Sequence, residues 1–380
     1  MQASTTTAST TDTRPPLQPR GPLSAQLLYV LGEEPGPAPQ LALAARELVA
    51  GCADVLHDAD LQLTLLVLHE LHHQGWPGVD DGWEWHPDLV ALAAEIERPT
   101  EQALRALAVD WLPSSTPGPA DVPRALGEIT RRDVGPSLSR HLARRGTREQ
   151  YAELLVHRSI YHLKEADPHT WAIPRLAGRA KAALVEIQAD EYGGGRAEWM
   201  HAALFGQTMR GLGLDDRYGH YLDDVPAITL AWANTMTLFG LHRRLLGAAV
   251  GHLAALEMTS STPMRRYGNG LRRLGFDVAT TRFYDEHVEA DAVHEQIAAH
   301  DLAGQLALAR PELVPDLLFG AAAALAIDVV LTEHVMSCWE AGASSLRSTR
   351  EPEDAQPPMT RLTDVHSGTS RRRVPVADPG

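Results

Sequence analysis

Apolar residues recur every three to four positions along most of the chain between about residues 21 and 344, and this period predicts an all-α protein. Ala and Leu dominate these segments, and alternating β-branched runs, which are typical of strands, are almost absent. From residue 147 onward, the helices expected from this pattern cover about 147–167, 176–206, 227–258, 280–300 and 315–338. We expect the last one, with its Ala/Leu run, to be a central packing element.

Two ends of the chain lack this periodicity. Residues 1–20 are rich in Thr, Ser and Pro, and residues 345–380 are rich in Arg, Asp, Pro and Ser, so both ends are predicted to be disordered. A Pro/Gly/Ser-rich stretch at 113–123 predicts a linker. The pattern therefore divides the chain into an N-terminal helical region, 21–112, and a larger helical domain, 124–344.

The buried stripe of the 280–300 helix contains two imidazoles where leucine is expected. Counted in steps of four and three, this stripe runs through Phe283, His287, Ala290, His294 and Ile297. The side chains of His287, Asp291 and His294 fall within an arc of about 60° on an ideal helix. These three residues are candidate metal ligands, because imidazole and carboxylate groups on one apolar stripe suit a divalent cation.

Three other helices carry acidic residues on or beside their apolar stripes. Glu165 ends one stripe, Glu257 ends another, and Glu191 or Glu198 accompanies His201 on the 176–206 helix, which Gly193, Gly194 and Gly195 interrupt. Buried carboxylates are costly unless cations or protons neutralise them.

The numbers of these groups suit two divalent metals. Four carboxylates balance two such ions, and three imidazoles complete their coordination: Glu165, Glu191, Glu257 and Asp291, with His201, His287 and His294. Carboxylate and histidine sites of this kind in helical bundles hold two iron ions. The usual pair of Glu-x-x-His motifs is absent from the larger helical domain, where only Glu198-x-x-His201 fits. Helical spacing alone favours Glu198 over Glu191 as the partner of His201.

With these residues, the segment from about 140 to 340 resembles the haem-oxygenase-like di-iron oxidases and oxygenases, a family of iron-containing redox enzymes. The resemblance rests on the His-x3-Asp-x2-His helix, on Glu191 with a His ten residues later, and on the spacing of Glu165 and Glu257. It implies a haem-oxygenase-like helical bundle preceded by an accessory helical region. The family pattern favours Glu191 as the ligand and leaves Glu198 as a candidate for a hydrogen bond to the ligands.

The resemblance also implies an activity. We expect two Fe²⁺ ions with O2 as co-substrate, an external electron donor, and a small-molecule substrate. The expected reaction is N-hydroxylation or a related oxidation of an amine or amino-acid-like compound in specialised metabolism. A homodimer formed through the N-terminal helices is a further expectation. One branch of the family carries a metal-binding cupin after this domain, whereas here the sequence continues into the 345–380 tail.

Composition narrows the class of partner. The 49 acidic and 34 basic residues give a net charge of −15, which argues against nucleic acid and anionic membranes as partners. Only two cysteines accompany 18 histidines, so a disulfide framework or thiolate metal site is not expected. No signal-peptide pattern occurs, and the apolar run from Leu317 to Ile327 is too short to span a bilayer. A cytoplasmic protein is therefore expected.

Three alternatives compete with the di-iron interpretation. His69-Glu70-x-x-His73 matches the helix motif of zinc peptidases, in which two His bind the metal and Glu is the base. Gly75 and Pro77 end that helix directly after the motif, which is a poor context for a peptidase. A non-catalytic helical scaffold, or a haem enzyme with a single proximal His, would leave the buried carboxylates without a purpose.

Overall fold

The structure is a computed structural model that describes residues 17–132 and 134–347, with residues 290–292 described by their backbone alone. All regular secondary structure in these residues is helical, which confirms the predicted all-α class. The α-helices are α1 (Pro22–Leu31), α2 (Gln40–Gly51), α3 (Ala59–Glu70), α4 (Pro87–Ala108), α5 (Val122–Thr130), α6 (Leu138–Arg145), α7 (Arg148–His162), α8 (Asp167–Thr170), α9 (Gly178–Glu191), α10 (His201–Gly211), α11 (Ala227–Leu241), α12 (Leu246–Arg273), α13 (Val278–Gln296), α14 (Gln305–Ala309) and α15 (Val314–Glu340). A π-helical segment, η9 (Ile297–Gly304), joins α13 to α14.

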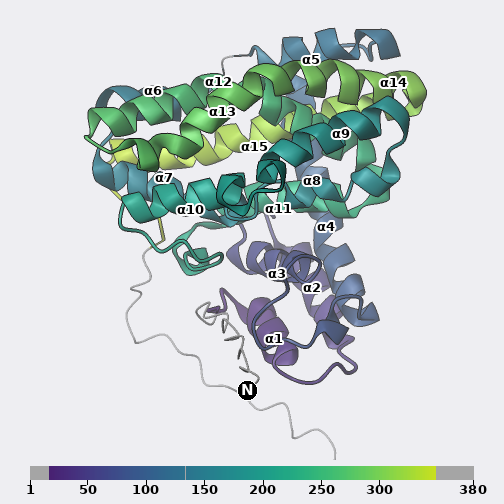
Figure 1. The fold of residues 1–380 in the computed structure, drawn as a ribbon. Helices are drawn as coiled ribbons and strands as arrows, with labels where there is room; N and C mark the ends of the chain where they lie inside the picture. Colours follow the sequence, from purple (N-terminus) through teal and green to yellow (C-terminus); the bar gives the residue numbers. More distant parts are fainter. Residues whose placement is uncertain (1–16, 133, 348–380) are drawn as a thin grey trace, which may run out of the picture. The chain divides into compact units, whose positions relative to one another are not determined.

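The long helices α12, α13 and α15 lie side by side and form one layer of a bundle (Figure 1). Helices α7, α10 and α11 run along the other side of this layer, and α9 packs against η9. Helices α1, α2 and α3 gather beside α11, and α4 extends from them to α15 (Figure 1). The accessory helices therefore contact the bundle directly.

Glycines let α12 and α15 approach closely. A Cβ atom on Gly251 would lie 1.9 Å from the Leu317 carbonyl oxygen, and one on Gly320 would lie 2.0 Å from the Ala248 carbonyl oxygen. Only hydrogen fits in these positions, so the two backbones are in contact. Helix α15 is largely buried, as its apolar run predicts. This contact fixes the wall of the bundle from which Glu257 projects.

The predicted 227–258 and 280–300 helices differ from the structure. The 227–258 helix is wrong as one element, because α11 ends at Leu241 and α12 begins at Leu246. The Arg175 guanidinium donates hydrogen bonds to the carbonyl oxygens of Gly240 and Leu241 at the end of α11. These carbonyls therefore need no further turn of helix to satisfy them. The 280–300 helix starts earlier than predicted, because the Asp277 side chain accepts a hydrogen bond from the Thr280 amide and caps it.

The described chain up to Arg347 is one compact unit. Most of the two ends predicted to be disordered, 1–20 and 345–380, lies outside the described residues. The parts that are described make contacts: the Arg20 guanidinium donates to the Leu222 carbonyl oxygen, and Ser345 is buried. The stretch 113–123 contains a single turn of 3-10 helix, Pro119–Asp121, that leads into α5.

One segment within the described residues, Pro311–Glu340, is long and apolar enough to cross a membrane by length and composition. It includes α15, and 67% of its most apolar window is buried against the rest of the protein. A helix that is buried in a protein core can be as long and as apolar as one that crosses a membrane.

Candidate metal centre

Glu165 lies in a tight turn. Helix α7 ends at His162, so the prediction that it continues to about residue 167 is wrong. Ala166 has φ of +77°, the only positive φ among the described non-glycine residues. This left-handed conformation costs a residue with a Cβ about 1–2 kcal/mol. The turn stops the helix and leaves Glu165 buried at 7% exposure.

A glycine turn separates Glu191 from His201. Helix α9 ends at Glu191, and α10 begins at His201. The three residues Gly193, Gly194 and Gly195 all have positive φ, at +67°, +59° and +83°. A Cβ on Gly193 would lie 2.6 Å from the Met200 amide nitrogen, so the chain turns tightly against itself here. The turn brings residues ten positions apart into contact, which a continuous helix would not do.

The first of two groups of ligand-type side chains includes Glu165. Its four ligand-type atoms all lie within 4.8 Å of one another, and the residues are Glu165, Glu191, His201 and His287. His201 Nδ1 is 2.8 Å from Glu191 Oε2, and His287 Nε2 is 3.7 Å from Glu165 Oε1. The rings of His201 and His287 lie beside each other, with centroids 4.2 Å apart.

The second group shares Glu191 with the first. It contains Glu191, Glu257 and His294, whose ligand-type atoms also lie within 4.8 Å of one another. His294 Nδ1 is 3.4 Å from Glu257 Oε2. One carboxylate thus lies between two clusters that come from α9, α10, α12, α13 and the turn after α7. A carboxylate that belongs to both groups can contact two neighbouring cations.

Several buried polar atoms of the two ligand groups lack hydrogen-bond partners, which suits the binding of cations. All six side chains are at most 7% exposed. Four of their buried atoms have no hydrogen-bond partner: Glu165 Oε2, Glu191 Oε2, His201 Nδ1 and His294 Nδ1. Buried polar groups are almost always satisfied. These carboxylate oxygens and imidazole nitrogens converge on the same places without hydrogen-bond partners. Atoms of these types are the usual ligands of iron and zinc.

Hydrogen bonds orient two of the imidazoles. His287 Nδ1 donates to the Phe283 carbonyl oxygen at 2.8 Å, so its Nε2 carries the lone pair and faces Glu165. His294 Nε2 is 3.0 Å from the Asp190 carboxylate, which leaves Nδ1 facing Glu257. Metal-binding histidines have the same support, since the second ring nitrogen donates to a carbonyl or a carboxylate.

The charges of the cluster shift its pKa values. Burial lowers the pKa of His294, but Glu257 and Asp190 outweigh it and raise the pKa from 6.5 to about 9. Burial likewise opposes the charged form of His201, and Glu191 raises its pKa above the ordinary value. Without cations, protons on the imidazoles therefore balance the buried carboxylates. A metal must displace those protons when it binds.

The structure brings six of the predicted site residues together. The seventh, Asp291, is on α13, but its side chain lies outside the described residues. Glu198 lies on a short turn at Ala197–Trp199, is exposed and belongs to neither group. The contact between Glu191 and His201 therefore agrees with the family pattern rather than with helical spacing.

Three neighbours of the cluster were not among the predicted site residues. His162 Nδ1 is 2.8 Å from Glu165 Oε1, and the three-residue spacing of the two residues in the predicted 147–167 helix was a usable signal. The hydroxyl of Tyr161 has its pKa raised well above 10 by burial and then by the charges of Glu165, Glu191 and Glu257. Asp190 pairs with a residue 104 positions away, which no local pattern indicates.

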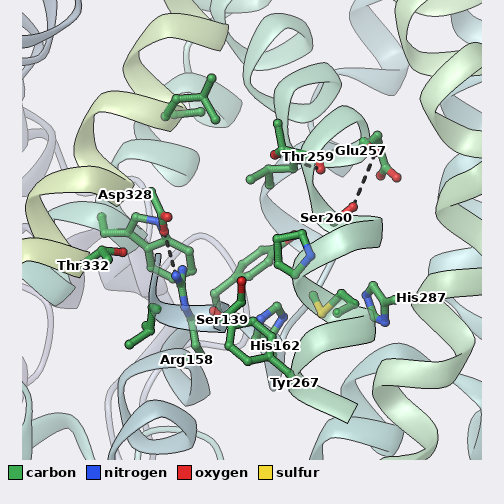
Figure 2. Close-up of a pocket in the computed structure, with 18 of the residues that line it drawn as sticks. Ser139, Arg158, His162, Glu257, Thr259, Ser260, Tyr267, His287, Asp328 and Thr332 are labelled. Carbon is green, nitrogen blue, oxygen red and sulfur yellow. Dashed lines mark hydrogen bonds and ion pairs between the residues drawn. The ribbon is translucent and has the colours of Figure 1, made fainter. Parts of the chain in front are cut away.

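A cavity of about 360 Å³ adjoins the cluster and is lined in part by Glu165, Glu191, Glu257 and His287. Figure 2 shows Arg158 and Asp328 on one wall, with Glu257 and His287 across from them. Arg158 Nη2 donates to Asp328 Oδ1 at 2.7 Å, and the guanidinium lies 4.4 Å from the centre of the Trp232 ring. This volume is in the range of small-molecule sites.

The zinc-peptidase motif has other partners in the structure. The Glu70 carboxylate accepts hydrogen bonds from Lys164 and Tyr218, and His69 Nε2 pairs with Glu97. His73 Nδ1 bonds to the carbonyl oxygen of His69. Within the described residues, these side chains do not form a group with metal-ligand geometry.

Comparison with known proteins agrees with this site. Residues 152–329 match the family described as iron-containing redox enzymes. The chain is also similar to a nitrosourea synthase of Streptomyces achromogenes subsp. streptozoticus, at 26% identity over 235 residues, which cover 60% of this chain and 48% of the relative. The chain thus spans about half the length of that curated relative.

Proposed function

Since residues 152–329 match the family of iron-containing redox enzymes, we propose that this protein is a non-haem di-iron, O2-dependent oxidase or oxygenase. The observation that carries the proposal is Glu191, which belongs to both buried ligand groups. Two groups joined by one carboxylate suit two iron ions, whereas a single ion would need only one group. Asp291 is proposed as a further ligand from its place on α13.

The side chains have separate roles in this proposal. Glu165, Glu191, His201 and His287 would hold one iron, and Glu191, Glu257, His294 and Asp291 would hold the other. When bound, two Fe²⁺ ions supply the electrons that reduce O2 and give the site its oxidising power. The protein orients the imidazoles through the Phe283 carbonyl and Asp190, and it keeps bulk water from the buried cluster.

The cavity supports a small polar substrate. Asp328 offers a carboxylate and Arg158 a guanidinium on the wall across from the metal ligands (Figure 2). These groups can recognise an amine or an amino-acid-like compound, and we propose N-hydroxylation or a related oxidation in specialised metabolism. The relative's name refers to a nitrosourea, a compound with an oxidised nitrogen. The reductant is proposed to be external, and the location cytoplasmic.

Metal analysis tests the di-iron proposal. The full chain is reconstituted with Fe²⁺ without oxygen, desalted, analysed for metals and then exposed to O2. About two Fe per chain and O2-dependent oxidation are expected. The His287→Ala variant should lose the oxidation and keep about one Fe, since His287 belongs to one ligand group alone. The exposed His57 on the surface offers a matched control, His57→Ala, that should behave as wild type.

The same measurement separates the alternatives. Zinc that stays bound while iron is not retained would favour the peptidase. A Soret band would favour haem, and a folded protein that retains no metal after reconstitution would favour a scaffold. Unchanged ferrous oxidation in His287→Ala would contradict the proposed site.

A further inference from the structure

A buried ion pair connects the N-terminal helices to the bundle. Lys164 Nζ donates to Glu70 Oε2 at 2.6 Å, and the Tyr218 hydroxyl donates to the same oxygen at 2.7 Å. The exposed fractions of Glu70 and Lys164 are 0% and 5%. Glu and Lys are almost never buried to this degree unless they are paired. Burial raises the pKa of Glu70, but the Lys164 charge and the two hydrogen bonds outweigh it and keep the carboxylate ionised.

This pair acts on the turn that carries Glu165. Lys164 directly precedes Glu165, and Ala166 follows in its left-handed conformation. Because α7 has already ended at His162, regular helical hydrogen bonds do not hold these residues in place. The other side of the turn is tied at Asp167, whose Oδ1 accepts a 2.7 Å hydrogen bond from the Tyr192 hydroxyl. Tyr192 directly follows Glu191. Each of the carboxylate residues Glu165 and Glu191 therefore has an adjacent residue, Lys164 or Tyr192, that is held by one of these hydrogen bonds.

We infer that Glu70 is a positioning residue for the metal ligand Glu165, which it holds through Lys164 and the backbone of the turn. The inference rests on the proposed role of Glu165 as a ligand. The N-terminal helical region thus contributes to the metal site from α3, although none of its side chains lies in either ligand group. This assigns a role to Glu70, the residue of the His69–His73 motif whose carboxylate bonds to Lys164 of the bundle domain.

A positional role and a packing role predict different results. Buried ion pairs can often be replaced by apolar residues without loss of stability, so stability alone is a poor measure of what this pair does. If the pair positions Glu165, its loss weakens one metal site of the folded protein. If it only packs α3 against the bundle, its loss changes the melting temperature and leaves metal affinity unchanged.

The test compares Glu70→Gln and Lys164→Met with Glu97→Gln in the metal-free full chain. Glu97 is a matched control, because it is buried in the same region and bridges His69 and His242 without contacting the turn. Anaerobic Co²⁺ titration, followed by visible absorption and by chelator competition, measures each metal site. Removing support from a metal ligand typically costs about 10- to 100-fold in affinity. We expect that loss for one Co²⁺ of two in the first two variants and in neither site of Glu97→Gln.

Circular dichroism and thermal melting of the same samples establish that each variant is folded. Should both first variants fail to fold, Tyr218→Phe removes a single hydrogen bond and is expected to weaken the same Co²⁺ site by a smaller factor. Folded variants that bind both Co²⁺ ions with wild-type affinity would overturn the inference. Failure of the wild-type chain to bind two Co²⁺ would instead overturn the proposed di-iron site, so the two failures are distinct.

Discussion

His201 Nδ1 lies 2.8 Å from Glu191 Oε2, yet the two atoms do not form a hydrogen bond. The distance is right for one, so the direction of the groups is what fails. In the metal-free protein, a proton on the imidazole makes this contact an ion pair. A cation that both atoms contact would take the place of that proton, so the contact is a local sign of a metal site.

Glu191 should matter to both metals and Glu257 to one. We expect Glu191→Ala to lose both Fe²⁺ ions and Glu257→Ala to keep about one, since Glu257 belongs to the second group alone. Loss of a ligand should weaken binding beyond the roughly 10- to 100-fold that is typical of its supporting residues. Iron content after anaerobic reconstitution is the measurement. Glu186→Ala, at an exposed position on α9, which also carries Glu191, is the control and should retain two Fe²⁺ ions. Equal iron loss in the Glu191 and Glu257 variants would rule out a shared carboxylate.

The metal-free protein should lose stability as the pH rises through the pKa of His294. That pKa is raised from 6.5 to about 9, so protonation stabilises the fold. The contribution is fully present below pH 6.5 and disappears as the pH rises through about 9. The difference between 6.5 and about 9 corresponds to at most about 3.4 kcal/mol, at 1.36 kcal/mol per pKa unit. Urea unfolding of the apoprotein between pH 6 and 10, for wild type and His294→Gln, measures it. An identical pH dependence in the two proteins would assign the effect elsewhere.

The same protons should make metal binding depend on pH in the opposite sense. Iron or cobalt must displace the proton of His294, so affinity rises with pH up to about 9. Proton release on Co²⁺ addition in weakly buffered solution should be detectable at pH 7 and should fall in the His294→Gln variant. Equal release from both proteins would show that His294 does not give up a proton to the metal.

Substitution in the glycine turn should disturb the cluster without removing a ligand. In Gly193→Ala, the new Cβ would lie 2.6 Å from the Met200 amide nitrogen, and φ there is +67°. Gly178→Ala is the matched control, since it also has a positive φ, of +57°, but has open space. The positive φ should cost each variant about 1–2 kcal/mol of unfolding free energy. Gly193→Ala should lose more, because its Cβ also meets the Met200 amide. Only Gly193→Ala should lower Co²⁺ affinity, as measured by titration; an equal loss in Gly178→Ala would point to general destabilisation.

Arg158→Lys should change substrate binding and leave the metals in place. Lysine lacks the planar fork that lets Arg158 stack on Trp232 while it bonds to Asp328. With a compound that accelerates ferrous oxidation in the wild type, the half-saturating concentration should rise about tenfold or more, as for a lost charged hydrogen bond. Arg124→Lys, an exposed arginine paired with Glu128, is the control. Reduced iron content in Arg158→Lys would contradict this division of roles.

Among the candidate ligands, the sequence located best those that lie on unbroken helices. Periodicity places His287 and His294 on the buried side of α13, and Glu257 on that of α12, and the structure has them there. Glu165 is harder, because the left-handed Ala166 that stops α7 is not a glycine and leaves no mark in the sequence. The three glycines before His201 did indicate a break in the helix, although they did not indicate the direction that the chain takes after it.

Long-range partners account for what sequence patterns missed. His294 pairs with Asp190 across 104 positions, and Lys164 with Glu70 across 94. Such contacts follow from how helices pack, which periodicity does not specify. The distinction between Glu191 and Glu198 shows the same limit: helical geometry favoured the wrong neighbour of His201, because it assumed a helix where the chain turns.

The glycine turn also changes which positions of this protein can vary. Three successive left-handed residues are accessible almost only to glycine, so part of the information for the metal site resides in positions that have no side chain at all. A search for altered function that varies only cavity and ligand residues would pass over them. Protein engineers who redesign the cavity should therefore treat Gly193, Gly194 and Gly195 as part of the proposed metal site.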